Sequence, residues 1–276
     1  MNRTGVVALM TATIVTIGVL LSGCSGTDGD TAAVEAADAQ VATIEPGVLT
    51  VCTFGVRPFE FQTDQSEWTG FDIDLLTAMA SDINGGLSLA VTVLPLDGIW
   101  LAPAEGTCDV VATALTITPE RAEVALFTDA YFASAQSLMV LESRSAELTG
   151  LDALAGSTIG VLANSVGAAY ADANAPTGAT IVGFANEDAM YTAIDTGEVD
   201  AVLNDLPLNA NRSNSQPGQY ALVGEFDTGE RYGFVVAKDN TALADALNQR
   251  LKAVRTDGSY QKIYDRYFGP VGATTP

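Results

Sequence analysis

The stretch CDVVATALTITPERAEVALFTDAYF, residues 108–132, contains the pattern that decides the fold. Its run 110–115 is short and uncharged, which is typical of a buried β-strand. Thr118 and Pro119 then predict the start of a short helix, with the threonine as N-cap and the proline in the first turn. A strand followed closely by a helix is the unit from which parallel α/β sheets are built.

Strands and helices alternate on both sides of this stretch. The runs 49–54 and 89–94 are further strand candidates. Between them, apolar residues recur at nearly every fourth position and predict one face of a helix: Phe71, Leu75, Met79 and Ile83. Downstream, three more strands are expected, at 137–141, 158–162 and 199–203, and Asn186 and Gly197 are typical of the two ends of a helix. Two α/β halves account for this pattern better than a single sheet does.

Charge and composition exclude several classes of function. The 276 residues include 34 Asp and Glu against 12 Lys and Arg, and the resulting net charge of −22 repels nucleic-acid phosphates. Histidine is absent, so a Ser-His-Asp triad, a Cys-His pair and an imidazole metal ligand are all excluded. No lysine stands in a GxxxxGK phosphate loop. We therefore expect no nucleic-acid partner, no cofactor and no metal site.

Residues 1–23 have the pattern of a secretory signal peptide. Arg3 precedes the apolar run 6–21, which is shorter than the roughly 20 residues that a membrane-spanning helix needs. The run ends in LSGC, which resembles a lipoprotein box, so Cys24 is expected to carry lipid after cleavage before it. An ordinary signal peptide with an incidental Cys24 is the alternative. Residues 24–45 lack aromatic side chains and read as a flexible tether.

Two further cysteines, Cys52 and Cys108, form an even pair outside the signal peptide. In an oxidising compartment such a pair suggests a disulfide. Cys52 lies in the run 49–54, and Cys108 immediately precedes the run 109–115. If these strands are neighbours in a parallel sheet, the two side chains could meet. Two buried free thiols are the alternative.

Five motifs follow one another from about residue 47 to residue 269: LTVCTFGVRPFEF, WTGFDIDLLTAMA, CDVVATALTITPERAEVALFTDAYF, GEVDAVLNDLP and DGSYQKIYDRYFG. In this order they resemble the extracellular solute-binding proteins of family 3, the receptors of polar amino-acid ABC importers. The most specific pieces are ITPER followed by FTDAYF, and VDAVLND.

The resemblance implies an α/β, two-lobed periplasmic-binding-protein fold of the type II kind, with parallel-rich sheets and a hinge of two crossover segments. Lobe 1 would comprise 46–134 and 231–270, and lobe 2 would comprise 139–226, with 271–276 as a tail. The hinge segments would lie near 135–137 and 225–231. Closure about such a hinge would couple ligand burial to a change of shape that a membrane partner can read.

Three residues near the ITPER motif are implied as ligand contacts. The planar guanidinium of Arg121 suits a ligand α-carboxylate, because it can donate two parallel hydrogen bonds. The alternative is an exposed arginine paired with Glu120 or Glu123. Thr116 would supply a hydroxyl and Ala114 a main-chain group.

Lobe 2 would supply the remaining polar contacts. The resemblance assigns Asp205 to the ligand α-ammonium, although an aspartate just before Pro207 is also a good N-cap. Ser165 and Val166 lie where a strand gives way to a helix, so their position favours an anion, with a plain serine cap as the alternative. Asn204 could contact the ligand side chain.

Selectivity is less strongly indicated. The loop 53–59 is one residue shorter than the usual loop of the family and lacks the acid that cation-binding relatives carry. Val56 replaces a stacking aromatic, which leaves Phe54 and Phe59 as the aromatic candidates. Arg57 could pair with an acidic or amide side chain, or could simply be solvated. Basic amino acids are therefore the less favoured ligands.

The combined prediction is a monomeric, lipid-anchored receptor on the extracytoplasmic face of the cell membrane. It would bind a small zwitterionic solute, an amino acid, and deliver it to an ABC importer permease without catalysis. One alternative is a dehydratase-like enzyme on the same fold, with Glu60 or Glu187 as its acid–base group. Another is a module that senses amino acids for a membrane partner.

Overall fold

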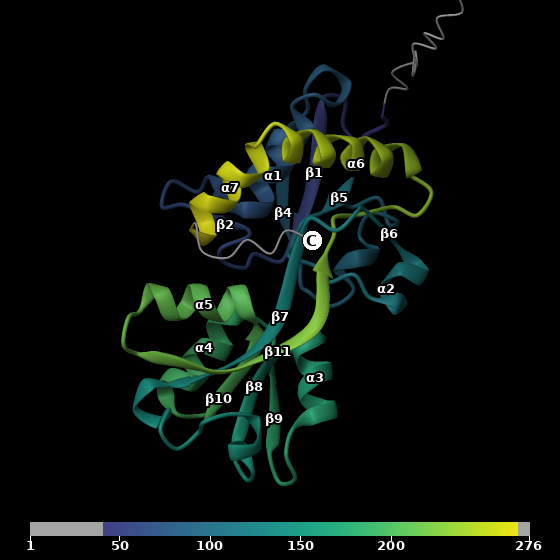
Figure 1. Cartoon of the computed structure of the whole chain (residues 1–276). Coiled ribbons are helices and arrows are strands. Elements are labelled where there is room, and N and C mark those ends of the chain that lie inside the picture. Colours follow the sequence, from purple (N-terminus) through teal and green to yellow (C-terminus); the bar gives the residue numbers. More distant parts are fainter. Residues whose placement is uncertain (1–40, 270–276) are drawn as a thin grey trace, which may run out of the picture. The chain divides into compact units, whose positions relative to one another are not determined.

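The computed structural model describes residues 41–269, which form two α/β lobes, each built on a five-stranded sheet (Figure 1). The predicted signal peptide with Cys24, the first part of the tether and the tail 271–276 lie outside the described residues. Within 41–269, no helix combines the length and the apolar character that crossing a membrane requires.

The sheet of lobe 1 has the strand order β4-β1-β5-β12-β6. Its strands are β1 (Val48–Thr53), β4 (Ser88–Val93), β5 (Val110–Val111), β6 (Leu126–Phe127) and β12 (Val235–Val236). β1 runs parallel to β4 and β5, whereas β12 runs antiparallel to β5 and β6. The helices α1 (Phe71–Ala80), α6 (Thr241–Thr256) and α7 (Ser259–Phe268) pack on one another beside this sheet (Figure 1). The C-terminal segment therefore completes the lobe that the N-terminal segment begins.

Two predicted elements of lobe 1 are shorter than the sequence indicates. The strand expected at 110–115 ends at Val111, and Ala114 further on adopts a left-handed φ of 46° that a strand does not allow. The helix expected to reach Ile83 ends at Ala80, and Ile83 begins a separate 3₁₀ turn while remaining buried. Apolar periodicity predicted the buried face correctly but not the break in the helix.

The sheet of lobe 2 has the strand order β11-β7-β10-β8-β9. Its strands are β7 (Phe132–Leu141), β8 (Thr158–Leu162), β9 (Thr180–Phe184), β10 (Ala201–Asp205) and β11 (Tyr220–Tyr232), and its helices are α3 (Val166–Asn174), α4 (Glu187–Thr196) and α5 (Leu206–Ser215). β8, β9 and β10 are parallel, and β7 runs antiparallel to β10 and β11. The predicted helix ends are confirmed, because Asn186 Oδ1 accepts a hydrogen bond from Ala189 N at 2.9 Å and Gly197 has a φ of 77°.

Short elements complete the described chain. They are β2 (Phe61–Gln62), β3 (Trp68–Thr69), α2 (Pro119–Val124) and the 3₁₀ turns Ile83–Gly85, Ile99–Leu101, Glu142–Arg144 and Leu151–Leu154. β2 and β3 pair with each other as a small antiparallel ribbon. α2 is the short helix that Thr118 and Pro119 predict, and Thr118 Oγ1 accepts a hydrogen bond from Arg121 N at 3.3 Å.

The long strands β7 and β11 are the two segments that run between the lobes (Figure 1). They pair with each other, but the register breaks between Phe226, opposite Gln136, and Glu230, opposite Ser134. Between these pairs Ala135 of β7 alone stands opposite the three residues 227–229 of β11, and a bulge of this kind bends a strand. The end of β11 also reaches lobe 1, through a bridge between Tyr232 and Thr116.

Cys52 and Cys108 are joined by a disulfide, with their Cα atoms 5.8 Å apart. β1 and β5 are parallel neighbours, as the sequence argument requires, with Cys52 opposite Val111. Both cysteines are buried, so the bond lies inside lobe 1.

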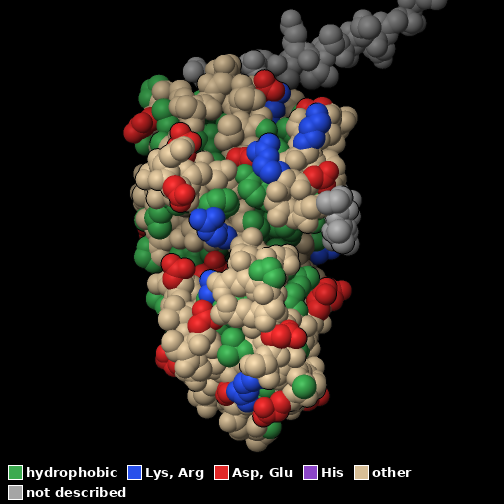
Figure 2. All heavy atoms as spheres, turned by 90° about the vertical axis from the view of Figure 1, so that its left-hand side faces the viewer, with side chains coloured by type: hydrophobic (Ala, Val, Ile, Leu, Met, Phe, Trp, Pro, Cys, Tyr) green, Lys and Arg blue, Asp and Glu red, His purple; other side chains and the backbone are tan. Residues whose placement is uncertain are grey.

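Charged side chains are spread over the surface. On the face shown in Figure 2, acidic side chains lie on both lobes with isolated basic ones between them. On this face the excess of acid covers the surface without forming one concentrated patch.

Candidate ligand-binding site

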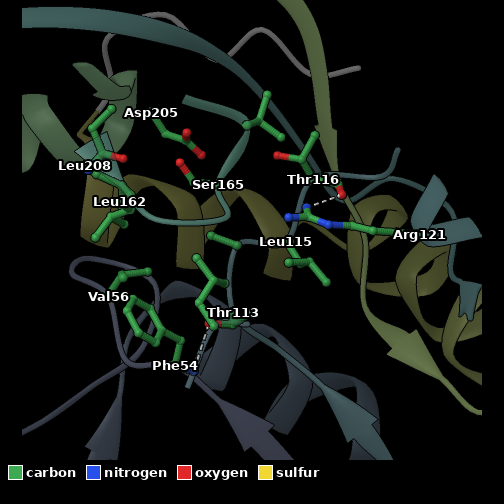
Figure 3. A pocket seen from close by; sticks show the side chains of 14 residues that line it. Phe54, Val56, Thr113, Leu115, Thr116, Arg121, Leu162, Ser165, Asp205 and Leu208 are labelled. Atoms are coloured by element: carbon green, nitrogen blue, oxygen red, sulfur yellow. Dashed lines mark hydrogen bonds between the residues drawn. The ribbon is translucent and has the colours of Figure 1, made fainter. Parts of the chain in front are cut away.

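A cavity lies between the two lobes (Figure 3). Most of the residues predicted at the ligand line it: Phe54, Ala114, Thr116, Arg121, Ser165, Val166, Asn204 and Asp205. Both lobes therefore contribute groups to one site. Figure 3 shows Arg121 on one side and Asp205, with Ser165 beside it, on the other.

Arg121 is held rigidly at one end of the cavity. Its side chain is 8% exposed, so the alternative of an exposed arginine is wrong. Nη1 donates to the carbonyl oxygen of Thr116 at 2.9 Å, and Nη2 lies 3.5 Å from the carbonyl oxygen of Asn164 in lobe 2. The guanidinium also lies over the ring of Trp100, 4.8 Å from its centroid. Since a guanidinium has five N–H donors, several remain for a ligand.

Asp205 lies at the opposite end, where β10 meets α5. It occupies the N-cap position, but its side chain makes no capping bond, so the predicted capping role is wrong. Oδ1 accepts a hydrogen bond from Gln136 Nε2 at 2.5 Å, and Oδ2 accepts one from the hydroxyl of Tyr232. Burial, reinforced by the nearby Glu230, raises the pKa of Asp205 to about 7. The carboxyl therefore changes charge near neutral pH while no cation is bound.

Glu230 is a polar neighbour of the site that sequence reasoning missed. It is 4% exposed and accepts hydrogen bonds from Thr116 Oγ1 at 2.9 Å, Gln136 Nε2 at 2.8 Å and Thr228 Oγ1 at 2.5 Å. Gln136 thus bridges Glu230 and Asp205 through one amide nitrogen. The polar groups of the cavity are connected in this way to both crossover strands.

Two buried acids support the floor of the cavity. Asp72 Oδ2 accepts a hydrogen bond from Ala114 N at 2.8 Å, and Glu60 Oε1 accepts one from Thr113 Oγ1 at 2.8 Å. Burial raises the pKa of Asp72 to about 7, and burial together with Asp72 raises the pKa of Glu60 well above its usual range. Glu60 is 0% exposed, yet it borders a neighbouring cavity together with Arg57 and Glu187.

Ser165 caps α3, because its Oγ accepts a hydrogen bond from Ala168 N at 3.0 Å. This confirms the simpler expectation of a serine cap. Ser165 and Val166 also line the cavity, so the positive end of the helix faces the same space as Arg121. An anion in the cavity would therefore be attracted from both lobes.

Two predicted contacts do not reach this cavity. Phe59 is 0% exposed and packs edge-on against Phe71, Phe132 and Tyr232, with centroids 5.1–6.0 Å apart, so the structure places it in the core of lobe 1 and not in the lining of this cavity. Arg57 is exposed, lies over the Phe61 ring at 4.0 Å and lines a neighbouring cavity.

Glu187 lines that neighbouring cavity as well. Its Oε1 accepts a hydrogen bond from Asn204 Nδ2 at 3.3 Å. Burial of the carboxyl raises the pKa of Glu187 to about 8. Among residues 41–269, no group of three or more acidic or cysteine side chains is placed to hold a metal ion.

The two α/β lobes are joined by two crossover strands, and the cavity between them has an arginine and an aspartate at its ends. These features define a two-lobed receptor for a small ligand. Residues 49–270 match the model of the bacterial extracellular solute-binding proteins, family 3. The chain belongs to this family, whose members act outside the cytoplasm.

Curated relatives cover most of the chain. The ABC transporter glutamine-binding protein of Bacillus subtilis (strain 168) is 30% identical over 264 residues, 90% of this chain and 92% of the relative. The histidine-binding periplasmic protein of Escherichia coli (strain K12) is 28% identical over 219 residues, 76% of this chain and 83% of the relative. These relatives are binding proteins.

Solved structures give the same result. An ancestral arginine-binding protein bound to arginine has a TM-score of 0.74 at 32% identity, and the match covers 81% of this chain and 99% of that one. An ancestral amino acid-binding protein described as a precursor of cyclohexadienyl dehydratase has a TM-score of 0.72 at 28% identity, with 80% of this chain and 95% of that one covered.

Proposed function

We propose that this protein is an extracytoplasmic receptor that binds an amino acid between its lobes, as a monomer, and delivers it to an ABC importer permease. The observation that carries the proposal is the placement of buried Arg121 and half-buried Asp205 at opposite ends of one cavity. An α-amino acid carries an anion and a cation on one carbon atom, so such a pair of charges matches it. Names of relatives that include glutamine, histidine and arginine support the same class of ligand.

In this proposal each group has a defined role. Arg121 donates two hydrogen bonds to the α-carboxylate, and the N-terminus of α3 at Ser165 and Val166 approaches the same group from lobe 2. Asp205 accepts hydrogen bonds from the α-ammonium. Thr116 contributes its hydroxyl and Ala114 a main-chain group. Phe54 and Asn204 then face the ligand side chain.

We further propose that the two lobes move against each other about a hinge. Lobe 1 comprises 46–134 and 231–270, lobe 2 comprises 139–226, and the hinge segments are 135–137 and 225–231. The register break between β7 and β11 supports a bend at this place. Ligand groups held from both lobes would favour the closed arrangement, because only that arrangement satisfies all of them.

A ligand screen tests the proposal. An amino acid present at about 100 times its Kd should stabilise the protein by about 2.7 kcal/mol, which corresponds to a rise in Tm of roughly 5–10 °C. Small-angle scattering of the same sample should show a smaller radius of gyration. If none of the twenty amino acids or their close relatives raises Tm, the proposal is contradicted. Turnover of prephenate or arogenate would instead support the dehydratase-like alternative. The reason to test it is the structural similarity to the ancestral precursor of cyclohexadienyl dehydratase.

We also propose that Cys24 carries lipid and anchors the receptor to the membrane. The support is the LSGC pattern at 21–24 after an apolar run. In cells that process lipoproteins, wild-type protein should sediment with the membranes and a Cys24→Ala variant should not. Equal membrane association of the two would contradict the anchor without affecting the proposed ligand.

A further inference from the structure

Asn204 lines the ligand cavity and belongs to a network of polar side chains in lobe 2, all of them buried except the half-buried Glu187. The proposed binding of the α-carboxylate and α-ammonium does not use this network. Its members are Ser137, Glu187, Tyr191, Asn204 and Asn209. Ser137 and Asn209 are 0% exposed and Asn204 is 2% exposed, so each group must find its hydrogen-bond partners inside the protein or in the cavity.

The directions of these hydrogen bonds follow from groups that can act in only one way. Ser137 Oγ donates to the carbonyl oxygen of Asn204 at 3.0 Å, since a carbonyl only accepts. Asn209 Nδ2 lies 3.0 Å from Ser137 Oγ and 3.2 Å from the carbonyl oxygen of Ser137, so the amino group of Asn209 must face this pair of acceptors. Asn209 Oδ1 is then left to accept from the hydroxyl of Tyr191, at 3.1 Å, which is shorter than the 3.4 Å between that hydroxyl and Glu187 Oε1.

The same argument fixes the side-chain amide of Asn204. Because the Tyr191 hydroxyl donates to Asn209, its oxygen accepts from Asn204 Nδ2, at 3.4 Å. Asn204 Nδ2 also donates to Glu187 Oε1 at 3.3 Å. Both N–H groups of this amide are therefore used behind the cavity wall. Within the described residues no donor reaches Asn204 Oδ1, which is the one side-chain polar atom of Asn204 left for a ligand.

Resting on the proposed function, we infer that Asn204 presents a fixed hydrogen-bond acceptor to the ligand side chain, so the receptor selects amino acids whose side chain carries an N–H donor. Such side chains end in an amide or in a cationic nitrogen. A ligand carboxylate in the same place would meet an acceptor that cannot rotate to donate, because rotation would break the bonds to Glu187 and Tyr191. Tyr191 and Asn209 act as positioning residues, since they hold the orientation without touching the ligand.

The rest of the wall strengthens this selection. The remaining lining residues are mainly apolar: Phe54, Val56, Leu96, Leu115, Leu162 and Leu208. A polar ligand group that fails to pair with Asn204 would therefore lose its hydrogen bonds to water without replacement.

Matched ligand pairs test the inference. Glutamine and glutamate have nearly the same shape but end in an amide and a carboxylate, as do asparagine and aspartate, while arginine and lysine form the cationic arm. We expect glutamine or asparagine to bind about a hundredfold or more tighter than glutamate or aspartate, respectively, or else arginine or lysine to bind that much tighter than either acid. If an acid binds as tightly as the best donor-bearing ligand, the inference is overturned and the proposed function stands. If no amino acid binds at all, both are overturned.

Variants separate orientation from stability. Tyr191→Phe removes one hydroxyl and keeps the ring, so the amide of Asn204 keeps only its bond to Glu187 and rotates more easily, and the amide-to-carboxylate affinity ratio should fall at least tenfold. Asn204→Asp, which keeps an acceptor, should preserve the rejection of carboxylates, whereas Asn204→Leu should lose it. Tyr170→Phe, in α3 of the same lobe, is the matched control and should leave the ratio unchanged. A Tyr191→Phe protein that melts earlier but keeps the wild-type ratio would show a merely structural role and overturn the inference.

Discussion

An Arg121→Ala variant is expected to bind its amino acid about a thousandfold more weakly than the wild type. Removing one partner of a buried, hydrogen-bonded charge pair costs about 2–5 kcal/mol, and 4 kcal/mol corresponds to roughly a thousandfold in Kd. Arg121 is 8% exposed and is anchored by Thr116, so no other cation lining the cavity can take its place. Isothermal titration calorimetry at pH 7.5 measures the change directly.

Two further variants make the Arg121 result specific. Arg121→Lys keeps the charge but loses the planar fork of donors, so its affinity should lie between those of wild type and Arg121→Ala. Arg250→Ala removes a surface arginine that lies 3.3 Å from Asp82, and it should bind within about twofold of wild type. An Arg121→Ala protein with wild-type Tm and an affinity within tenfold of wild type would contradict the assignment of the α-carboxylate.

Helix ends and side-chain positions that are set by neighbouring residues along the chain could be predicted from the sequence. Thr118 and Pro119 begin α2 as expected, and this start places Arg121 in the first turn of the helix, facing the cavity. The N-cap at Asn186 and the C-terminal glycine at Gly197 are equally local. Each of these depends on contacts within a few residues along the chain, which a motif records.

Side chains whose partners lie far away along the chain could not be predicted from the sequence. Glu230 accepts hydrogen bonds from Thr116 and Gln136, which are 114 and 94 residues away along the chain, and no motif announces either contact. Phe59 belongs to the same short loop as Phe54, yet its ring packs into a core that Phe268 of α7 completes. A loop pattern alone cannot show which of two nearby aromatic residues turns inward.

The two functions weighed for Asp205 show the same limit. Its position before a helix suggested both a ligand contact and a cap, and the local sequence suits either. The structure directs both carboxylate oxygens to Gln136 and Tyr232, on β7 and β11, so neither oxygen caps α5. Long-range pairing of the crossover strands therefore decides how this residue is used.

Lowering the pH is expected to weaken amino-acid binding through Asp205. Burial and the nearby Glu230 raise the pKa of this carboxyl to about 7 in the empty site, so below pH 7 it is mostly protonated. The ligand ammonium binds only the ionised carboxylate of Asp205, so below pH 7 this carboxyl must lose its proton when the ligand binds. Affinity should fall by up to about tenfold for each pH unit below 7, or roughly a hundredfold between pH 7 and pH 5. Above pH 7, affinity should change little until the ligand ammonium itself loses its proton.

An Asp205→Asn variant should show weak binding at every pH and no such slope, because an amide neither pairs with the ammonium charge nor titrates. The loss at pH 7.5 should approach several hundredfold, since the variant leaves a buried cation without its partner, at a cost of about 3–5 kcal/mol. Glu187 also has a raised pKa, of about 8, and lies near Asp205, so Glu187→Gln is the control and should retain the slope below pH 7. The opposite result would be that affinity still falls with pH in Asp205→Asn but no longer does so in Glu187→Gln. Glu187, and not Asp205, would then be the group that must ionise before the ligand binds. The α-ammonium would have to be assigned to a different part of the cavity.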